Sequence, residues 1–219
     1  VFGVYSSESC LNATFVSGKI PSGHLAMITQ SGALGLTLVG QASVENIGLS
    51  AIVSVGNKSD IDESDLLTYL CDHEPTRIIL MYIEGIRNGE KFIRAVRTAA
   101  LKKPIMVIKS GRSSKGAQAA ASHTGSLAGS DEVFDDVVRQ CGALRAESTK
   151  EAFNWAVFHL ANPLPKGNNV VIITNGGGAG VMAADACEKY GVSLYDDPQE
   201  LKRVFSPAIP AFGSAKNPI

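Results

Sequence analysis

The strongest constraint on the fold is a regular alternation of short apolar runs with segments of helical periodicity. Four apolar runs of strand length lie at residues 25–29, 49–55, 77–83 and 104–108. Helix-type segments lie at residues 33–46, 62–72, 89–100, 131–140 and 149–160. Nearly continuous apolar strands that alternate with helices are typical of a parallel sheet covered on both faces. The sequence therefore predicts an α/β fold with a doubly wound parallel sheet.

The chain divides at a stretch rich in proline and glycine that begins at Asn162. Residues 1–161 are predicted to form the first domain, in which residues 1–23 have a loop-like composition. Residues 162–219 are predicted to form a linker and the start of a second α/β domain, with a strand at 170–174 and helices at 179–190 and 198–205. About 50 residues are too few for a complete doubly wound domain, so we expect a fragment of a longer protein.

Charge and composition exclude several classes of function. The formal net charge is −1, so the composition gives no sign of a basic surface that would bind nucleic acid or an anionic membrane. No apolar run reaches the roughly 18 residues that a membrane helix needs, and no signal peptide is visible. The four cysteines are scattered without CxxC spacing, which favours reduced thiols in the cytoplasm over zinc ligands or disulfides. No metal site is predicted.

The segment between Arg112 and Leu127 places one imidazole, that of His123, among small side chains. Such a segment buries little apolar area, and long loops in compact domains are usually functional or disordered. We expect a loop that presents His123 as a nucleophile, since neutral imidazole is reactive near neutral pH. The alternative is a solvated surface histidine.

Two turns 145 residues apart share one design, in which a strand, a threonine and an amide side chain lead through small residues into a helix. Unpaired N–H groups and the helix dipole at such a turn form an anion site. The candidate phosphate-binding residues are Gln30, Ser31, Gly32, Asn175, Gly176, Gly177 and Gly178. A histidine facing both helix starts would suit a phosphoryl group on imidazole. The alternative is a tight turn with close helix–sheet packing.

Charged residues near these turns have two interpretations each. Glu84 directly follows the apolar run at 77–83, so it either orients the imidazole from the ligand crevice or is an exposed glutamate at a strand end. Lys109 and Arg112 flank the entry to the histidine segment. They either bind an anion or hold the loop, and the sequence does not choose between these roles.

Six short motifs are spread along nearly the whole chain. The most specific is Ser122-His-Thr-Gly-Ser-Leu-Ala-Gly129. The others are Gln30-Ser-Gly-Ala-Leu-Gly35, Gly56-Asn-Lys-Ser-Asp60, Tyr82-Ile-Glu-Gly85, Lys109-Ser-Gly-Arg-Ser113 and Thr174-Asn-Gly-Gly-Gly-Ala-Gly180. Together they resemble the nucleoside-diphosphate-forming acyl-CoA synthetases, the branch of the succinyl-CoA synthetase superfamily that includes the ADP-forming acetyl-CoA synthetases.

The resemblance implies a flavodoxin-like, succinyl-CoA synthetase-type domain and the reaction acyl-CoA + ADP + phosphate ⇌ acid + CoA + ATP. It implies that His123 carries the phosphoryl group, that Glu84 stabilises the phosphohistidine, and that residues 56–60 contact CoA. It implies no covalently bound cofactor. The substrates would be CoA or acyl-CoA, phosphate, and ADP or ATP with Mg²⁺.

The family also has parts that this chain lacks. A CoA-binding domain and an ATP-grasp nucleotide domain are expected on the same protein or on a partner subunit, so the nucleotide site would lie outside this chain. The complete protein would be an oligomer, and the isolated fragment would be inactive. Acyl specificity is not visible in the sequence.

Two other functions stay open at this point. One is the ligand-sensing domain of a protein acetyltransferase, because some of those proteins resemble the same domains. The other is a flavodoxin-like module that binds a phosphate-bearing ligand. The presence of both His123 and Glu84 favours the enzyme, because a sensor has no chemical need for an oriented imidazole nucleophile.

Overall fold

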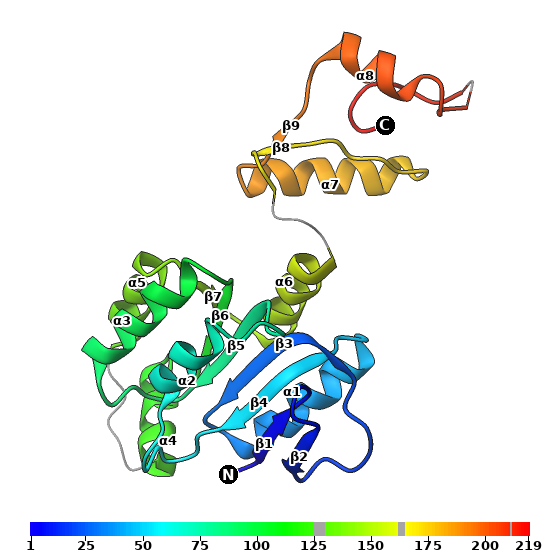
Figure 1. The fold of residues 1–219 in the computed structure, drawn as a ribbon. Coiled ribbons are helices and arrows are strands. Elements are labelled where there is room, and N and C mark those ends of the chain that lie inside the picture. Colours follow the sequence, from blue (N-terminus) through cyan, green and yellow to red (C-terminus); the bar gives the residue numbers. More distant parts are fainter. Residues whose placement is uncertain (125–129, 162–164, 211) are drawn as a thin grey trace. The chain divides into compact units, whose positions relative to one another are not determined.

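The computed structural model describes residues 1–124, 130–161, 165–210 and 212–219, and of residues 120–124 the backbone alone. The chain forms two compact units, Val1–Pro163 and Leu164–Ile219, and each is described by itself (Figure 1). Among the described residues, no helix is long and apolar enough to cross a bilayer.

The first unit is built on a seven-stranded sheet. Its strands are β1 (Gly3–Ser6), β2 (Leu11–Thr14), β3 (Ser22–Thr29), β4 (Leu49–Ser54), β5 (Ile78–Ile83), β6 (Ile105–Lys109) and β7 (Leu144–Ala146). The order across the sheet is β2-β1-β4-β3-β5-β6-β7, and the strands from β4 to β7 run parallel. This parallel part has the strand order of flavodoxin. The predicted α/β fold is therefore confirmed.

Helices cover both faces of the sheet, as the apolar runs predicted. On one face, α1 (Gly32–Val44) and α6 (Thr149–Ala161) bury Leu38 and Phe153 against β3, β5 and β6. On the other face lie α2 (Glu63–Leu70), α3 (Gly89–Ala100) and α5 (Asp131–Gln140). Strand residues alternate between the two cores, because successive side chains of a strand point to opposite faces.

Two antiparallel strands extend one edge of the sheet where the sequence predicted only a loop. β1 pairs with both β2 and β4. Phe2, just before β1, is 2% exposed, and Tyr5, within it, is 7% exposed. The backbone N–H of Phe2 donates to Ser54 Oγ at 3.0 Å. The loop prediction was wrong because two four-residue strands are too short to show a period, and their pairing depends on β4 far along the chain.

The histidine segment also differs from its prediction. Residues predicted as a loop form the helix α4 (Ser114–Thr124). Ser113 accepts a hydrogen bond from the Gly116 N–H at 3.0 Å near its start. Its composition explains the helix, because alanine is the strongest helix former and outweighs one glycine. His123 lies near the end of α4, and its side chain falls outside the described residues.

The second unit contains β8 (Asn169–Val170), α7 (Gly177–Lys189), β9 (Ser193–Leu194) and α8 (Pro198–Phe205). β8 pairs with β9 in parallel, and is shorter than the strand predicted at 170–174. The rest of that segment bonds to the end of the chain instead. Thr174 N donates to Ile219 O at 2.9 Å, and Ile219 N donates to Ile172 O at 2.8 Å.

Candidate functional site

The candidate site of the first unit lies where β3 and β5 are neighbours, at their carboxyl ends. The chain leaves β3 into α1 on one face of the sheet, whereas α2 and α3 cover the other face. In flavodoxin-like sheets this reversal leaves a crevice outside the strand ends. The first residue after β3 is Gln30, and the first residue after β5 is Glu84. The topology therefore places two of the predicted site residues side by side.

A side-chain-to-backbone contact joins these two strand ends. Gln30 Oε1 accepts hydrogen bonds from the N–H of Glu84 at 2.9 Å and from the N–H of Gly85 at 3.2 Å. The backbone N–H of Gln30 donates to Tyr82 O at 3.1 Å. Because the amide oxygen accepts both bonds, the amide nitrogen points away from the turn. Gln30 thus holds the Glu84 turn and presents a donor on its other side.

The start of α1 provides the predicted helix N-terminus. Ser31 is its N-cap, with extended backbone angles, and its hydroxyl accepts from Leu34 N at 3.3 Å. Thr29 Oγ1 donates to Ser31 O at 2.6 Å, which fixes the turn between β3 and α1. The first turn of α1 has no acidic side chain, so no carboxylate of its own neutralises the dipole there. The N–H of Gly32 lies in this first turn.

Glu84 has a phenol as its neighbour. Burial raises the pKa of Tyr82, a hydrogen bond with Ser110 lowers it, and the Glu84 carboxylate raises it again. The Glu84 carboxylate therefore lies beside the phenol of Tyr82, whose other polar neighbour is Ser110, the first residue after β6. A carboxylate in this position can accept a proton or a hydrogen bond from a group that enters the crevice.

Lys109 and Arg112 have a structural partner that the sequence did not indicate. Their charged groups lie 3.9 Å and 3.4 Å from the carboxylate of Asp131, the first residue of α5. Arg145 of β7 donates to the same carboxylate at 2.8 Å. Burial alone would raise the pKa of Asp131, but Arg145 and Lys109 hold it below its usual value. Arg145 was missed because β7 has only three residues.

These contacts hold both ends of the histidine segment. Arg112 precedes α4, and Asp131 begins the next helix, so one ion cluster joins the two ends of residues 113–130. Phe134 packs under the cluster, with Arg145 Cζ 5.0 Å and Lys109 Nζ 5.5 Å from its ring centroid. Of the two sequence interpretations, this geometry favours the one in which Lys109 and Arg112 hold the segment.

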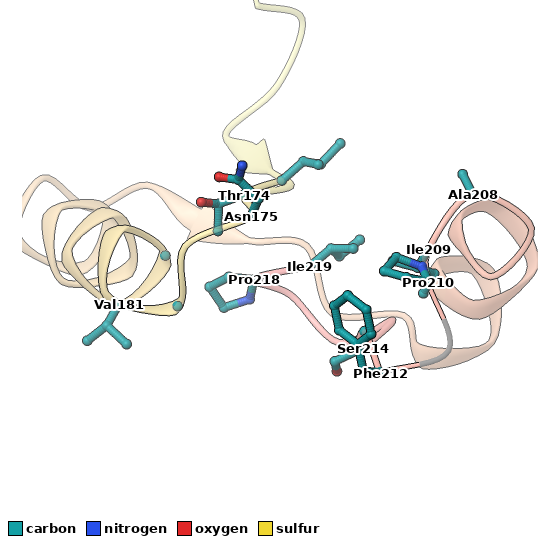
Figure 2. Close-up of a pocket in the computed structure, with 14 residues that line it drawn as sticks. Thr174, Asn175, Val181, Ala208, Ile209, Pro210, Phe212, Ser214, Pro218 and Ile219 are labelled. Carbon is teal, nitrogen blue, oxygen red and sulfur yellow. The ribbon is translucent and has the colours of Figure 1, made fainter.

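In the second unit, the predicted glycine turn begins α7. Gly176 is the N-cap, its N–H donates to Thr174 Oγ1 at 3.1 Å, and helix α7 starts at Gly177. Asn175 and Gly177 line a cavity of about 700 Å³ whose other walls include Phe212 and Pro218 (Figure 2). Gly178 follows within the first turn of α7. Whether both helix starts face one histidine stays a prediction, because it concerns both units.

Within the described ranges, no group of three or more histidine, cysteine or acidic residues could hold a metal ion. The role of His123 as nucleophile also stays a prediction. The structure thus brings Gln30, Ser31, Gly32 and Glu84 together in the first unit, and Asn175 to Gly178 in the second.

Sequence comparisons identify two families along the chain. Residues 22–159 match the model of the succinyl-CoA ligase like flavodoxin domain, and residues 170–219 match that of the ligase-CoA domain. The alpha subunit of acetate–CoA ligase [ADP-forming] I from Pyrococcus furiosus is 55% identical over 100% of this chain, which covers 47% of that protein. The 4-hydroxybutyrate–CoA ligase [ADP-forming] from Nitrosopumilus maritimus is 41% identical over 97% of this chain and 31% of its own length.

A solved structure has a similar fold. The dinucleotide forming acetyl-coenzyme A synthetase 1 from Ca. Korarchaeum cryptofilum, in complex with phosphate and ADP, matches with a TM-score of 0.93 and 45% identity. The match covers 100% of this chain and 48% of that one. The chain therefore spans about half or less of the length of these relatives.

Proposed function

The chain belongs to the ADP-forming acyl-CoA synthetases of the succinyl-CoA ligase family, and we propose that it contributes the phosphohistidine relay of such an enzyme. The proposed reaction is acyl-CoA + ADP + phosphate ⇌ acid + CoA + ATP. The observation that carries the proposal is the convergence of Gln30, the α1 N-terminus and Glu84 at the sheet's switch point. Such a crevice combines donors for a phosphate with a carboxylate for an imidazole.

The proposed chemistry has three steps. Phosphate attacks the thioester carbonyl, the C–S bond breaks, and CoA leaves as a thiol with the proton that phosphate gives up. An imidazole nitrogen of His123 then attacks phosphorus, the bond to the acyl oxygen breaks, and the acid leaves as a carboxylate. Finally, the β-phosphate oxygen of ADP attacks phosphorus, the N–P bond breaks, and ATP forms.

Each residue of the candidate site has a role in this scheme. The N–H groups at Ser31 and Gly32 and the Gln30 amide nitrogen stabilise the phosphoryl oxygens, because they are donors at a helix N-terminus. Glu84 accepts a hydrogen bond from the N–H of the second imidazole nitrogen and so fixes the tautomer. In the second unit, Asn175, Gly176, Gly177 and Gly178 would provide a second phosphate-facing helix start.

The rest of the enzyme would complete the reaction. We propose that a CoA-binding domain and an ATP-grasp domain, on the same protein or a partner subunit, supply the CoA and Mg²⁺–nucleotide sites. His123 would carry the phosphoryl group from the site of the acyl phosphate to the nucleotide site of the ATP-grasp domain. The complete protein would be a cytoplasmic oligomer. The ligand-sensing alternative is not favoured, because the relatives reported above are CoA ligases and synthetases.

Intact-protein mass spectrometry at mildly alkaline pH tests this function, because phosphohistidine is acid-labile. The complete protein is incubated with acetyl phosphate, or with ATP and Mg²⁺. One phosphate adduct is expected in the wild type and in His24→Ala, which removes an exposed imidazole at the start of β3. The adduct should be absent in His123→Ala. If the complete protein binds phosphate reversibly without any adduct, the relay is refuted and the sensor is favoured.

A further inference from the structure

A buried lysine lies next to the proposed site without taking part in the chemistry. Lys58 follows β4, and its Nζ lies 2.7 Å from Glu63 Oε2 in the first turn of α2. Each side chain is only 2% exposed. Transferring two charges from water into a protein interior is costly, and well-packed apolar residues are often equally stable there. The ion pair therefore calls for an explanation other than stability.

The second contact of the Lys58 ammonium group supplies that explanation. Its Nζ donates to Gly85 O at 2.5 Å, and Gly85 is the residue after Glu84. The N–H of Gly85 already donates to Gln30 Oε1. The N–H of Gly85 is thus held by Gln30, which follows β3, and its carbonyl oxygen is held by Lys58, in the turn after β4.

The backbone of Lys58 is part of the same arrangement. Lys58 has a φ of +54°, a backbone conformation that residues other than glycine adopt at some energetic cost. Its carbonyl oxygen accepts a hydrogen bond from Arg87 Nη1 at 2.6 Å, and Arg87 also follows β5. Two bonds in opposite directions therefore join the turn after β4 to the turn after β5.

We infer that Lys58 is a positioning residue for Glu84. The inference rests on the proposed function, in which Glu84 orients the imidazole. Lys58 acts through the carbonyl of Gly85 and sets the direction in which the preceding carboxylate points. Glu63 is the buried counter-ion of the ammonium group. Losing the contact should misplace the carboxylate, and a displacement of about 1 Å in a catalytic group can cost about 100-fold in rate.

Two variants separate positioning from folding. Lys58→Met alone leaves Glu63 buried and unpaired, so it should destabilise the fold. The double variant Lys58→Met/Glu63→Leu replaces the pair by apolar groups, which restores stability without a donor for Gly85. Glu63→Gln also breaks the charge pair and should destabilise the fold, but it keeps Lys58 and its bond to Gly85, so its rate is compared per folded protein. Fluorescence of Trp155, the single tryptophan of these 219 residues, reports the folded fraction of the first unit when stability is measured on this chain.

The measurement is the rate of phosphohistidine formation from acetyl phosphate in the complete protein. We expect the double variant to be slowed about 10- to 100-fold at wild-type stability. Glu63→Gln should stay within about threefold of the wild-type rate, by the same positioning argument. Lys91→Met is the matched control, because Lys91 pairs with Asp62 and Asp65 of the α2 start but does not contact the Glu84 turn. Its rate should be unchanged.

A second comparison distinguishes positioning from a general loss of order. On a Glu84→Gln background, the double variant should cause no further slowing, because the group that Lys58 positions has lost its charge. A wild-type rate in the stable double variant would overturn the inference and leave the proposed function intact. Equal slowing in Glu63→Gln and the double variant would also overturn it. The absence of an adduct in the wild type would overturn both the inference and the proposed function.

Discussion

The substitution Asp131→Asn tests the ion cluster that joins the two ends of the histidine segment. Asparagine has the same shape and keeps a carbonyl oxygen that can accept from Arg145. It carries no charge, so Lys109 and Arg145 are left without their shared counter-ion. Both of these side chains are 3% exposed, and Asp131 itself is 19% exposed. The cost should therefore be that of breaking a buried ion pair and not a surface pair.

The expected magnitude follows from this burial. Removing one partner of a buried pair costs about 3–5 kcal/mol. Partial exposure of Asp131 and the remaining amide acceptor reduce this, so we expect a loss of about 3 kcal/mol in the free energy of unfolding. Asp135→Asn is the control on the same helix, because Asp135 pairs with Arg139, which is 69% exposed. That variant should lose only about 0.3–0.5 kcal/mol.

Urea unfolding monitored by Trp155 fluorescence measures both values for the first unit, with an unchanged dependence on urea concentration. The effect should also depend on pH. The pKa of Asp131 in the folded protein is below its ordinary value of 3.8, so its stabilisation is fully present above that value. It is lost as the pH falls through the folded-state pKa of Asp131. The free energies of unfolding of the wild type and of Asp131→Asn should then converge. Losses within 1 kcal/mol of each other for the two variants (about the scale of a surface pair) would refute the reasoning.

Three further substitutions test the packing of the first unit by the same fluorescence assay. A Cβ at Gly48 would lie 2.2 Å from Ser22 O, so Gly48→Ala should cost roughly 1–3 kcal/mol, whereas Gly40→Ala has open space in α1 and should stabilise by up to about 1 kcal/mol. Equal effects of the two alanines would contradict this. Thr76→Val should cost about 1–3 kcal/mol, because Thr76 Oγ1 lies 2.7 Å from Ser50 Oγ and 2.8 Å from His73 Nδ1 and both groups are buried. A neutral effect would show that neither contact is needed.

Local patterns predicted the helices well where capping and periodicity agree. The predicted helices at 89–100, 131–140 and 198–205 have the observed bounds. Asn88 and Asp197 cap two of them with side-chain hydrogen bonds to the first turn. The edge strands and α4 were missed for different reasons. The edge strands exist only by pairing with β4, and in α4 the glycines of the surrounding segment concealed a run of alanines that favours helix.

The sequence predicted the residues of the candidate site but not the hydrogen bonds between Gln30 and the Glu84 turn. Gln30 and Glu84 were each identified from their place after a strand. Their hydrogen-bonded contact depends on β3 and β5 being neighbours, and that follows from the strand order and not from any local pattern. Lys58 and Asp131 were not identified as positioning residues, because a buried charge looks like a surface charge in a sequence until its partner is known.

The location of the buried charges argues that they hold backbone in place. Lys58 and Glu63 lie after β4, Lys109 is the last residue of β6, and Arg145 is the middle residue of the three-residue strand β7. Both ion clusters therefore lie near the carboxyl ends of the strands. A fold selected for stability alone would gain as much from apolar residues at these positions. Apolar side chains, however, cannot donate to a particular carbonyl or carboxylate. One cluster holds the turn of Glu84, and the other joins the residues before α4 to the start of α5, which are the backbone positions nearest in sequence to the residues of the proposed relay.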